Sequence, residues 1–475
     1  MKSVTVMLVA ALTGTAAAQA GAQPAQPVPP APPPARPPAQ PTPAAPGGPS
    51  PATPTTSGGP EVLTLERAIE IAMRQQPSLR QSNAQLEAAR GRVDLSRVGT
   101  RPTIALSGSV GTGSSRGGAG GTGTGSGATA ADSGFFTHSE STNLQASASW
   151  RIYDFGQTAA NIRAAELNAD AAAAAVGTSQ LDVRTGVETT YLEAVARRKL
   201  VEVAEATVKS EDAHLDQARR FVAAQAKDPI EVAQAQSRDA NAKSALAQAQ
   251  SNEAIALANL RSAIGWVDPA NSPIVSPNWP TPSEAEPPGL AALVDTARKS
   301  RPEIVQLDKE LQAADASLDA ARAERRPVLS ANANTLWAPG TNDWSPEPSW
   351  SAGLTLSWNL YDGGRASADA RIARANVQSS IASRDALLVT LTSQLDSSRS
   401  QIVANRANVQ ASTEAVTAAR AQLQLAEARY TQGLGSQIEL ADAQTAVTTA
   451  QGNLVTAEFQ LATAWAQLHR QTAQP

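Results

Sequence analysis

The sequence predicts an α+β protein built as a tandem repeat, with two β-strands and several α-helices in each half. Three observations support this prediction. The phrase SWRIYDFGQ, which begins at Ser149, returns as SWNLYDGGR at Ser357. Apolar and polar residues alternate up to each copy, as in a half-buried β-strand. A long proline-free stretch rich in alanine, a strong helix former, follows each copy.

Residues 1–20 have the pattern of a secretory signal peptide, because Lys2 precedes an apolar run that leads into small residues. A membrane anchor is the alternative interpretation, but this apolar run is far shorter than the roughly 20 residues that a spanning helix needs. Residues 21–60 are dominated by Pro, Ala, Gln, Thr and Gly. Such a composition buries too little apolar surface to fold, so this segment is interpreted as a disordered tether.

The overall composition excludes several classes of protein. The 475 residues contain no cysteine, which rules out disulfides, thiolate metal sites, cysteine catalysis and a lipid on an N-terminal cysteine. The formal net charge of −4 and the lack of a basic cluster with aromatics argue against a nucleic-acid partner. Beyond the signal peptide no apolar run has the length of a membrane helix, so any membrane contact would use β-strands.

The repeat extends beyond the shared phrase. Matching prolines occur at Pro77 and Pro302, and the segment IEVAQAQ from Ile230 matches IELADAQ from Ile438. These matches divide the chain into repeat 1 (61–265), an inter-repeat waist segment (266–288), repeat 2 (289–470) and a C-terminal tail (471–475).

The first half carries extra residues between its two strands, in the stretch GSSRGGAGGTGTGSGATAADSG, which is interpreted as a flexible surface loop. The loop contains a G-x-G-x-x-G match at Gly118, Gly120 and Gly123. A dinucleotide-binding loop would need a preceding strand and a following helix, and this context is missing.

Four stretches alternate as β-strands, at 103–110, 143–152, 328–337 and 350–360, each with one apolar face and one face of small polar residues. This pattern suits a barrel wall with lipid outside and water inside. A soluble sandwich, whose strands also alternate, is the alternative. The barrel is favoured because tryptophans gather at the strand ends, like an interfacial girdle: Trp150, Trp337, Trp344, Trp350 and Trp358.

Four strands cannot close a barrel, because the smallest membrane barrels need about eight. An open sheet edge is not tolerated in lipid. The sequence therefore predicts a barrel shared between subunits, without fixing their number.

The helices are unusually long. The proline-free stretches 156–224 and 364–432 would each span about 100 Å at 1.5 Å per residue. Helices returning over 229–264 and 436–468 are about half as long, and shorter helices after Pro77 and Pro302 lead into the strands. Two shorter helices would then stack end to end beside each long one. An ordinary coiled coil is the alternative, but a hollow helical cylinder explains why these helices begin at membrane strands.

At this point the chain resembles the TolC-type outer-membrane factor family, over about residues 61–470. The resemblance rests on the duplicated halves, on the W-x-x-Y-D-x-G junctions at Trp150 and Trp358, and on RYTQGLGSQIELADAQ from Arg429. It implies a homotrimer whose 12-stranded β-barrel lies in the outer membrane of a Gram-negative bacterium and continues as a periplasmic α-helical barrel. It also implies a passive exit duct for efflux or type I secretion, with a periplasmic adaptor protein and an inner-membrane RND or ABC-type transporter as partners.

The resemblance places the gate at the periplasmic tip of the helices. Two acidic positions of the family motif match Glu439 and Asp442, and Glu231 matches the first of them in the other half, where Gln234 replaces the second. Helix capping is the alternative role for two of these residues, because Ser436 with Glu439 forms a capping-box pattern and Glu231 lies in a first turn. Capping does not explain Asp442.

The same resemblance implies a tip hairpin that docks the adaptor, at Tyr430, Gly433, Gly435 and Phe221. The family pattern has a basic residue at the position of Gly435, so a latch of the same chemistry is not expected here. The interfacial aromatics would be Trp150, Trp358, Trp337 and Trp350, in contact with outer-membrane lipid.

No catalytic constellation is found, so we expect no enzymatic activity, no cofactor and no metal. His138, His214 and His469 lack metal-ligand spacing, and a P-loop is absent. Two further functions stay open: a periplasmic scaffold without a pore, and an autonomous porin. A small-polar lumen is compatible with drugs, metal ions, polysaccharides and polypeptides as cargo.

Overall fold

The computed structural model describes residues 62–116, 136–225, 227–266, 274–275, 279, 286–339 and 346–474. The predicted signal peptide, the tether, most of the Gly-rich loop, most of the waist segment and Trp344 lie outside these residues. The first four residues of the predicted loop, 113–116, belong to a strand instead. All described residues belong to the compact unit Gly59–Pro475.

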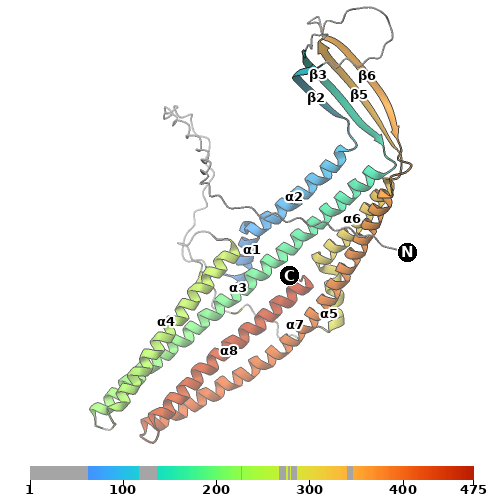
Figure 1. Cartoon of the computed structure of the whole chain (residues 1–475). Coiled ribbons are helices and arrows are strands. Elements are labelled where there is room, and N and C mark those ends of the chain that lie inside the picture. Colours follow the sequence, from blue (N-terminus) through green and yellow to red (C-terminus); the bar gives the residue numbers. More distant parts are fainter. Residues whose placement is uncertain are drawn as a thin grey trace, which may run out of the picture. The chain divides into compact units, whose positions relative to one another are not determined.

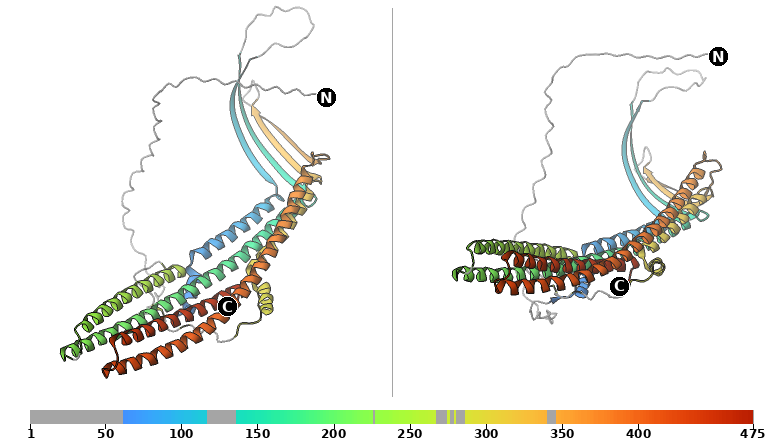
Figure 2. Two further views of the ribbon diagram at one scale, coloured as in Figure 1. Left: turned by 60° about the horizontal axis from the view of Figure 1, so that its bottom comes forward. Right: turned by 90° about the horizontal axis from the view of Figure 1, so that it is seen from below.

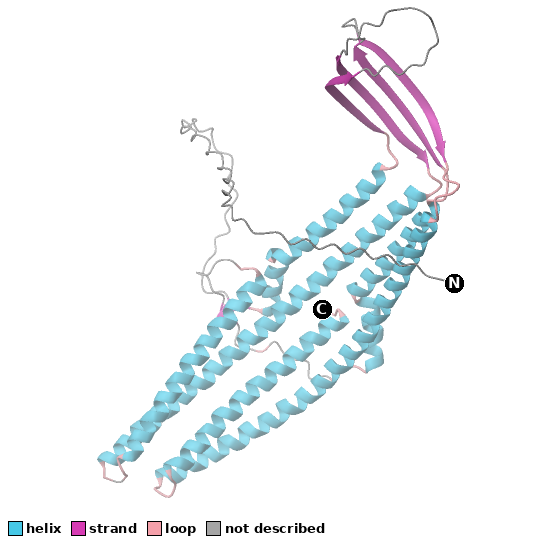
Figure 3. Ribbon diagram, in the orientation of Figure 1, coloured by secondary structure: helices cyan, strands magenta, loops and turns pink. Residues whose placement is uncertain are grey.

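Both halves have the predicted order of two helices, two strands, a long helix and a returning helix (Figures 1 and 3). The first half comprises α1 (Leu65–Gln75), α2 (Pro77–Val98), β2 (Thr103–Arg116), β3 (Phe136–Tyr153), α3 (Gln157–Ala223) and α4 (Ile230–Ile264). The second comprises α5 (Leu290–Ser300), α6 (Pro302–Ala323), β5 (Val328–Pro339), β6 (Pro346–Ser357), α7 (Arg365–Thr431) and α8 (Gln437–Thr472). The short strands β1 (Val62–Leu63) and β4 (Ile274–Val275) pair in parallel.

The strands are longer than expected. Strands β2 and β3 have 14 and 18 residues, against about ten that the alternation indicated. Their extra residues are mainly Gly, Ser and Thr, which extend the backbone ladder without an apolar pattern. In β2 and β3, periodicity therefore marked only the part of the strand that carries an apolar face, whereas the stretch predicted over 350–360 runs three residues past the end of β6.

An aspartate of the repeated phrase lies just before each long helix and accepts hydrogen bonds from its first turn. Asp154 accepts hydrogen bonds from the backbone N–H of Gly156 (3.3 Å) and Thr158 (2.8 Å), and also from the Thr158 hydroxyl. Asp362 accepts from Gly364 and Ala366, each at 2.8 Å. These bonds satisfy amide groups that have no partner inside the helix.

The glycines of the phrase turn the chain between strand and helix. Gly156 and Gly364 are the N-cap residues of α3 and α7 and have φ values of 100° and 92°, which are unfavourable for residues with a Cβ. The phrase recurs because both halves need the same strand-to-helix turn.

One four-stranded antiparallel sheet unites the halves in the order β2-β3-β5-β6, so β2 and β6 form its edges. The register places Leu106, Ala146, Thr335 and Trp350 in one row across the sheet. The neighbouring row, Ser107, Gln145, Leu336 and Ser349, lies on the opposite face. The predicted apolar and mainly polar faces are therefore continuous across all four strands.

The helices lie side by side along their length. Helix α3 packs against α2, α4, α6 and α8, and α7 packs against α6 and α8. Figure 2 shows from two further directions that α8 lies between α3 and α7. Among the described residues, no helix combines the length and apolar character that crossing a membrane requires. The α3–α8 contact, which we call the seam, joins repeat 1 to repeat 2 in the lower half.

Two repeat-related apolar clusters hold the short helices against the long ones. In the first half, Ala68 and Ala72 of α1 pack on Val187 and Tyr191 of α3, and the Tyr191 hydroxyl donates to the carbonyl of Leu63 at 3.0 Å. In the second half, α5 packs on α7 and α8 through the cluster Leu293, Ala297, Leu391, Leu395, Trp465 and Leu468. The short helices thus fix the middle of the long ones.

Candidate functional site: the hairpin tip

The two helical hairpins end in turns of different chemistry. In the α7–α8 turn, Gly433 has a φ of 75°, and the amides of Leu434 (2.9 Å) and Gly435 (3.0 Å) donate to the carbonyl of Arg429. In the α3–α4 turn, Gln225 takes the left-handed conformation with a φ of 58°. A glycine tolerates this conformation better than other residues, so the α7–α8 turn is the less strained one.

Glu231 joins the two hairpins at this tip. The Tyr430 hydroxyl donates to Glu231 Oε2 at 3.0 Å, and the Gln437 side chain donates to the Glu231 backbone carbonyl at 3.1 Å. Lys227 lies 3.3 Å from Glu231 Oε1 and 4.9 Å from the centroid of the Tyr430 ring. We call Glu231, Tyr430, Gln437 and Lys227 the tip lock, because they hold α4 of repeat 1 against α7 and α8 of repeat 2.

The tip lock is well shielded. Tyr430 is 2% exposed, and Phe221 packs on it edge to face with 5.8 Å between ring centroids. Burial, together with the hydrogen bond to Glu231 and its charge, raises the Tyr430 pKa to about 12. The phenol therefore stays protonated, as a hydrogen-bond donor must.

The two acidic residues of repeat 2, Glu439 and Asp442, have different surroundings. Glu439 Oε1 lies 3.2 Å from Arg429 Nη1, so its charge is partly neutralised within the chain. Its backbone N–H donates to the Ser436 hydroxyl at 3.1 Å, which is one half of the predicted capping box. Asp442 is exposed and pairs with no side chain in the described part of the chain. Asp442 is thus the carboxylate of this pair that is available to solvent.

Gly435 has little room for a side chain. A Cβ at this position would lie 3.1 Å from the Tyr430 nitrogen and 3.2 Å from Arg429 Cβ. A residue with a side chain here would require the backbone of the turn at Arg429 and Tyr430 to shift by a few tenths of an ångström.

The other predicted tip residues occupy mixed environments. Gln234 is exposed on α4, and Phe221 is half-buried. The exposed apolar side chains at the tip are Leu434 (71%), Ile438 (66%) and Ile230 (59%).

Of the predicted interfacial tryptophans, Trp150, Trp337 and Trp358 lie within or next to the last residues of a strand, whereas Trp350 lies inside β6. Two of them have equivalent contacts. The Trp150 indole donates to the Thr100 carbonyl at 3.0 Å, and the Trp358 indole donates to the Arg325 carbonyl at 3.1 Å. Trp337 is 46% exposed and Trp350 is 81% exposed. The indole N–H groups of Trp150 and Trp358 therefore each fix the turn between a leading helix and its strand.

The remaining histidines have ordinary contacts. His214 Nε2 lies 3.2 Å from the Ser210 hydroxyl. Burial, and the positive charge of Arg184, lower the His469 pKa. The side chain of His138 lies outside the described residues.

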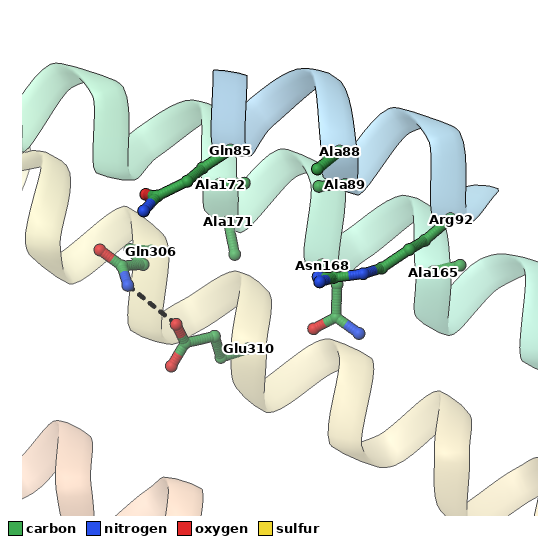
Figure 4. Close-up of a pocket in the computed structure, with 10 residues that line it drawn as sticks. All are labelled: Gln85, Ala88, Ala89, Arg92, Ala165, Asn168, Ala171, Ala172, Gln306 and Glu310. Carbon is green, nitrogen blue, oxygen red and sulfur yellow. Dashed lines mark hydrogen bonds between the residues drawn. The ribbon is translucent and has the colours of Figure 1, made fainter. Parts of the chain in front are cut away.

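A groove of about 570 Å³ lies on α3 between α2 and α6 (Figure 4). Its floor is formed by alanines, and its polar rim includes Arg92, Asn168 and Glu310, which accepts a hydrogen bond from Gln306 at 2.9 Å. The groove therefore joins a small apolar floor to amide and charged groups.

Sequence reasoning found the acidic residues but missed their partners Lys227, Arg429 and Gln437. Tyr430 and Glu231 are far apart in the chain, and no local pattern connects them. The repeat alignment carried one usable signal: Glu231 and Glu439 are repeat-related, so both hairpin ends belong at one tip.

The comparisons with known proteins agree with this architecture. The family model for the outer membrane efflux protein matches residues 68–266 and 293–474. Protein CyaE of Bordetella pertussis is 30% identical over 320 residues, which cover 66% of this chain and 64% of CyaE. The match thus spans just under two thirds of that relative's length.

Solved structures with the same fold include two channels. CusC, whose structures concern transmembrane channel formation, has a TM-score of 0.73 and 18% identity, and the match covers 86% of this chain and 92% of the other. The outer membrane channel CmeC of Campylobacter jejuni has a TM-score of 0.70 and 15% identity, with 86% and 85% covered.

Proposed function

Because the chain belongs to the outer membrane efflux protein family, we propose that it is a passive exit duct gated at its hairpin tip. It lies in the outer membrane of a Gram-negative bacterium and extends into the periplasm. One observation supports the duct above the others: a sheet with one apolar and one mainly polar face leads directly into two helices of 67 residues each.

We propose that the duct is a homotrimer with a 12-stranded β-barrel. Each chain supplies a four-stranded sheet with β2 and β6 as edges, and three such sheets would pair edge to edge. Edge pairing would satisfy the backbone groups that lipid cannot. The apolar rows would face lipid, and the polar rows would line a water-filled lumen.

The tip lock would hold the gate closed. Tyr430 and Gln437 tie repeat 2 to Glu231 of repeat 1, so the duct can widen only when these bonds break. The energetic cost of opening would then be supplied by a docking partner.

That partner would be a periplasmic adaptor protein coupled to an inner-membrane RND or ABC-type transporter. The exposed Leu434, Ile438 and Ile230 give the tip an apolar surface that a helical partner could cover. A pore-free scaffold is the competing function, and it predicts a protein that is extracted from membranes without detergent.

The gate is tested by ion selectivity in planar bilayers. Three Asp442 carboxylates, each about 6 Å from a passing cation, would attract it by roughly 0.7 kcal/mol apiece in bulk water. Asp442→Asn should therefore lower the cation-to-anion permeability ratio several-fold. Glu439→Gln should have a smaller effect, because Arg429 already pairs with Glu439.

Glu205→Gln, at an exposed carboxylate far along α3 from the tip, is the matched control. Unchanged selectivity in Asp442→Asn would refute the acidic ring.

A further inference from the structure

Trp279, in the waist segment between the repeats, contacts both sides of the seam. Its indole N–H donates to Glu458 Oε2 of α8 at 2.6 Å. Lys199 Nζ of α3 lies 4.9 Å from the centroid of the indole ring and 3.4 Å from the same Glu458 oxygen. The ring also packs against Leu192 of α3.

The seam has different chemistry above and below this point. Above it, toward the strands, Arg470 of α8 lies 2.6 Å from Asp182 of α3. Below it the contacts are neutral: Thr207 with Thr448 at 3.0 Å, and Ser210 donating to Gln444 at 3.2 Å. In the described part of the chain, no ion pair joins α3 to α8 between Glu458 and the tip.

Neutral hydrogen bonds between hydroxyl and amide groups are easily exchanged for bonds to water, since each contributes only about 1 kcal/mol net. A charged pair reinforced by an indole donor and a cation–π contact is stronger. The lower seam can therefore separate while the upper seam stays closed. Trp279 lies at the boundary between the neutral contacts of the lower seam and the charged contacts of the upper seam.

We propose that Trp279, Glu458 and Lys199 form a clamp that stops the seam from opening beyond this level. The clamp limits how far α8 can move away from α3 when the tip lock breaks. Only the part of the hairpins between Glu458 and the tip then moves. Trp279 acts as a positioning residue, and this inference rests on the proposed opening at the tip.

The absence of cysteine from the chain allows unique pairs of spin labels. One pair reports below the clamp, at Lys209 and Thr449, and one above it, at Gln180 and Gln467; all four side chains are exposed. Distances are measured by pulsed electron paramagnetic resonance on the full-length protein in detergent. This measurement does not require the protein to conduct.

Trp279→Phe keeps an aromatic ring but removes the indole donor, and Glu458→Ala removes the acceptor. We expect each variant to increase the separated population at Gln180 and Gln467 on the order of tenfold, the loss expected for a hydrogen bond to a charged group. The double variant should show no further increase over Glu458→Ala, because that change already removes the acceptor of the Trp279 hydrogen bond.

Trp266→Phe is the matched control, since Trp266 and Trp279 pack on the same apolar cluster, but in the described residues only Trp279 donates its indole N–H to a carboxylate. Unchanged upper distances in Trp279→Phe, or an equal change in Trp266→Phe, would overturn the clamp. The duct itself is judged separately, by the conductance and selectivity of the wild-type protein.

Discussion

Tyr430 joins the two hairpins through one hydroxyl, and the proposed gate depends on this hydrogen bond. Tyr430→Phe keeps the ring that packs on Phe221 but removes the hydrogen bond to Glu231. A bond to a charged acceptor contributes about 1.5–3 kcal/mol, so the ratio of separated to joined hairpins should rise roughly 10- to 100-fold. The measurement is single-channel conductance in planar bilayers, where longer or larger openings are expected.

Tyr361→Phe is the control for this substitution, because Tyr361 is 90% exposed at the other end of α7. If Tyr430→Phe conducts like the wild type, the tip lock does not limit opening.

The pKa of Tyr430 predicts how the contribution of the Tyr430–Glu231 hydrogen bond to folding stability depends on pH. Burial and the nearby Glu231 carboxylate raise the Tyr430 pKa to about 12, above its ordinary value near 10. The folded state therefore binds the phenolic proton more tightly than the unfolded state does. The resulting stability is complete below about pH 10 and is lost as pH rises toward 12.

Thermal unfolding of wild type and Tyr430→Phe in detergent checks this prediction. The difference between their midpoints should be constant from about pH 7 to 9 and shrink above about pH 10. A difference that already disappears near pH 8 would contradict a protonated Tyr430 as the donor.

At the scale of single residues, the sequence predicted positions better than partners. The repeat placed Glu231 and Glu439 at equivalent positions, and capping was a valid alternative for both. The structure gives them unlike roles, since Glu231 accepts from Tyr430 while Glu439 pairs with Arg429. Such partners depend on how the two hairpins meet, which no local pattern encodes.

The junction between strand and helix is the element on which both halves depend. Asp154 is 7% exposed, and burial opposes its ionisation, but the hydrogen bonds from Thr158 and Gly156 lower its pKa overall. Asp154→Ala should destabilise the start of α3 by about 1 kcal/mol, as expected for a lost helix cap. Asp154→Asn, which can still accept a hydrogen bond, should cost less.

Circular dichroism of the purified protein on heating measures the change. Asp94→Ala is the control, because Asp94 on α2 has a side chain that is 79% exposed. Because the Asp154 pKa is lowered on folding, its contribution is present above about pH 4 and is lost as pH falls further. Equal melting of Asp154→Ala and Asp94→Ala would remove Asp154 from the capping role.

Element order was predictable because the signals are local. The prolines at Pro77 and Pro302 begin α2 and α6, and the repeated phrase marks the end of β3 and the start of α3 and α7. Strand length was not predictable, because the Gly-, Ser- and Thr-rich ends of β2 and β3 have no apolar alternation. The Trp279 clamp was missed because it joins three segments distant in the chain.

At the scale of the whole molecule, the two faces of the sheet must have opposite environments if the chain forms a lipid-embedded duct. Leu106 and Ser107 are neighbours in β2 that lie on opposite faces, opposite Ala146 and Gln145 of β3. Leu106→Arg would place a charge in lipid, at a cost of about 2–4 kcal/mol near the bilayer midplane. Ser107→Arg would place the same charge in a water-filled lumen, where it stays hydrated.

The amount of each variant recovered in outer-membrane fractions, and its conductance, distinguish these environments. We expect Leu106→Arg to be depleted from the membrane, and Ser107→Arg to assemble normally with altered ion selectivity. The two substitutions introduce the same side chain one residue apart in the same strand, so the introduced charge, size and β-propensity are matched. Equal recovery of both variants would mean that neither face meets lipid, and a sheet that pairs in water would then explain the alternation.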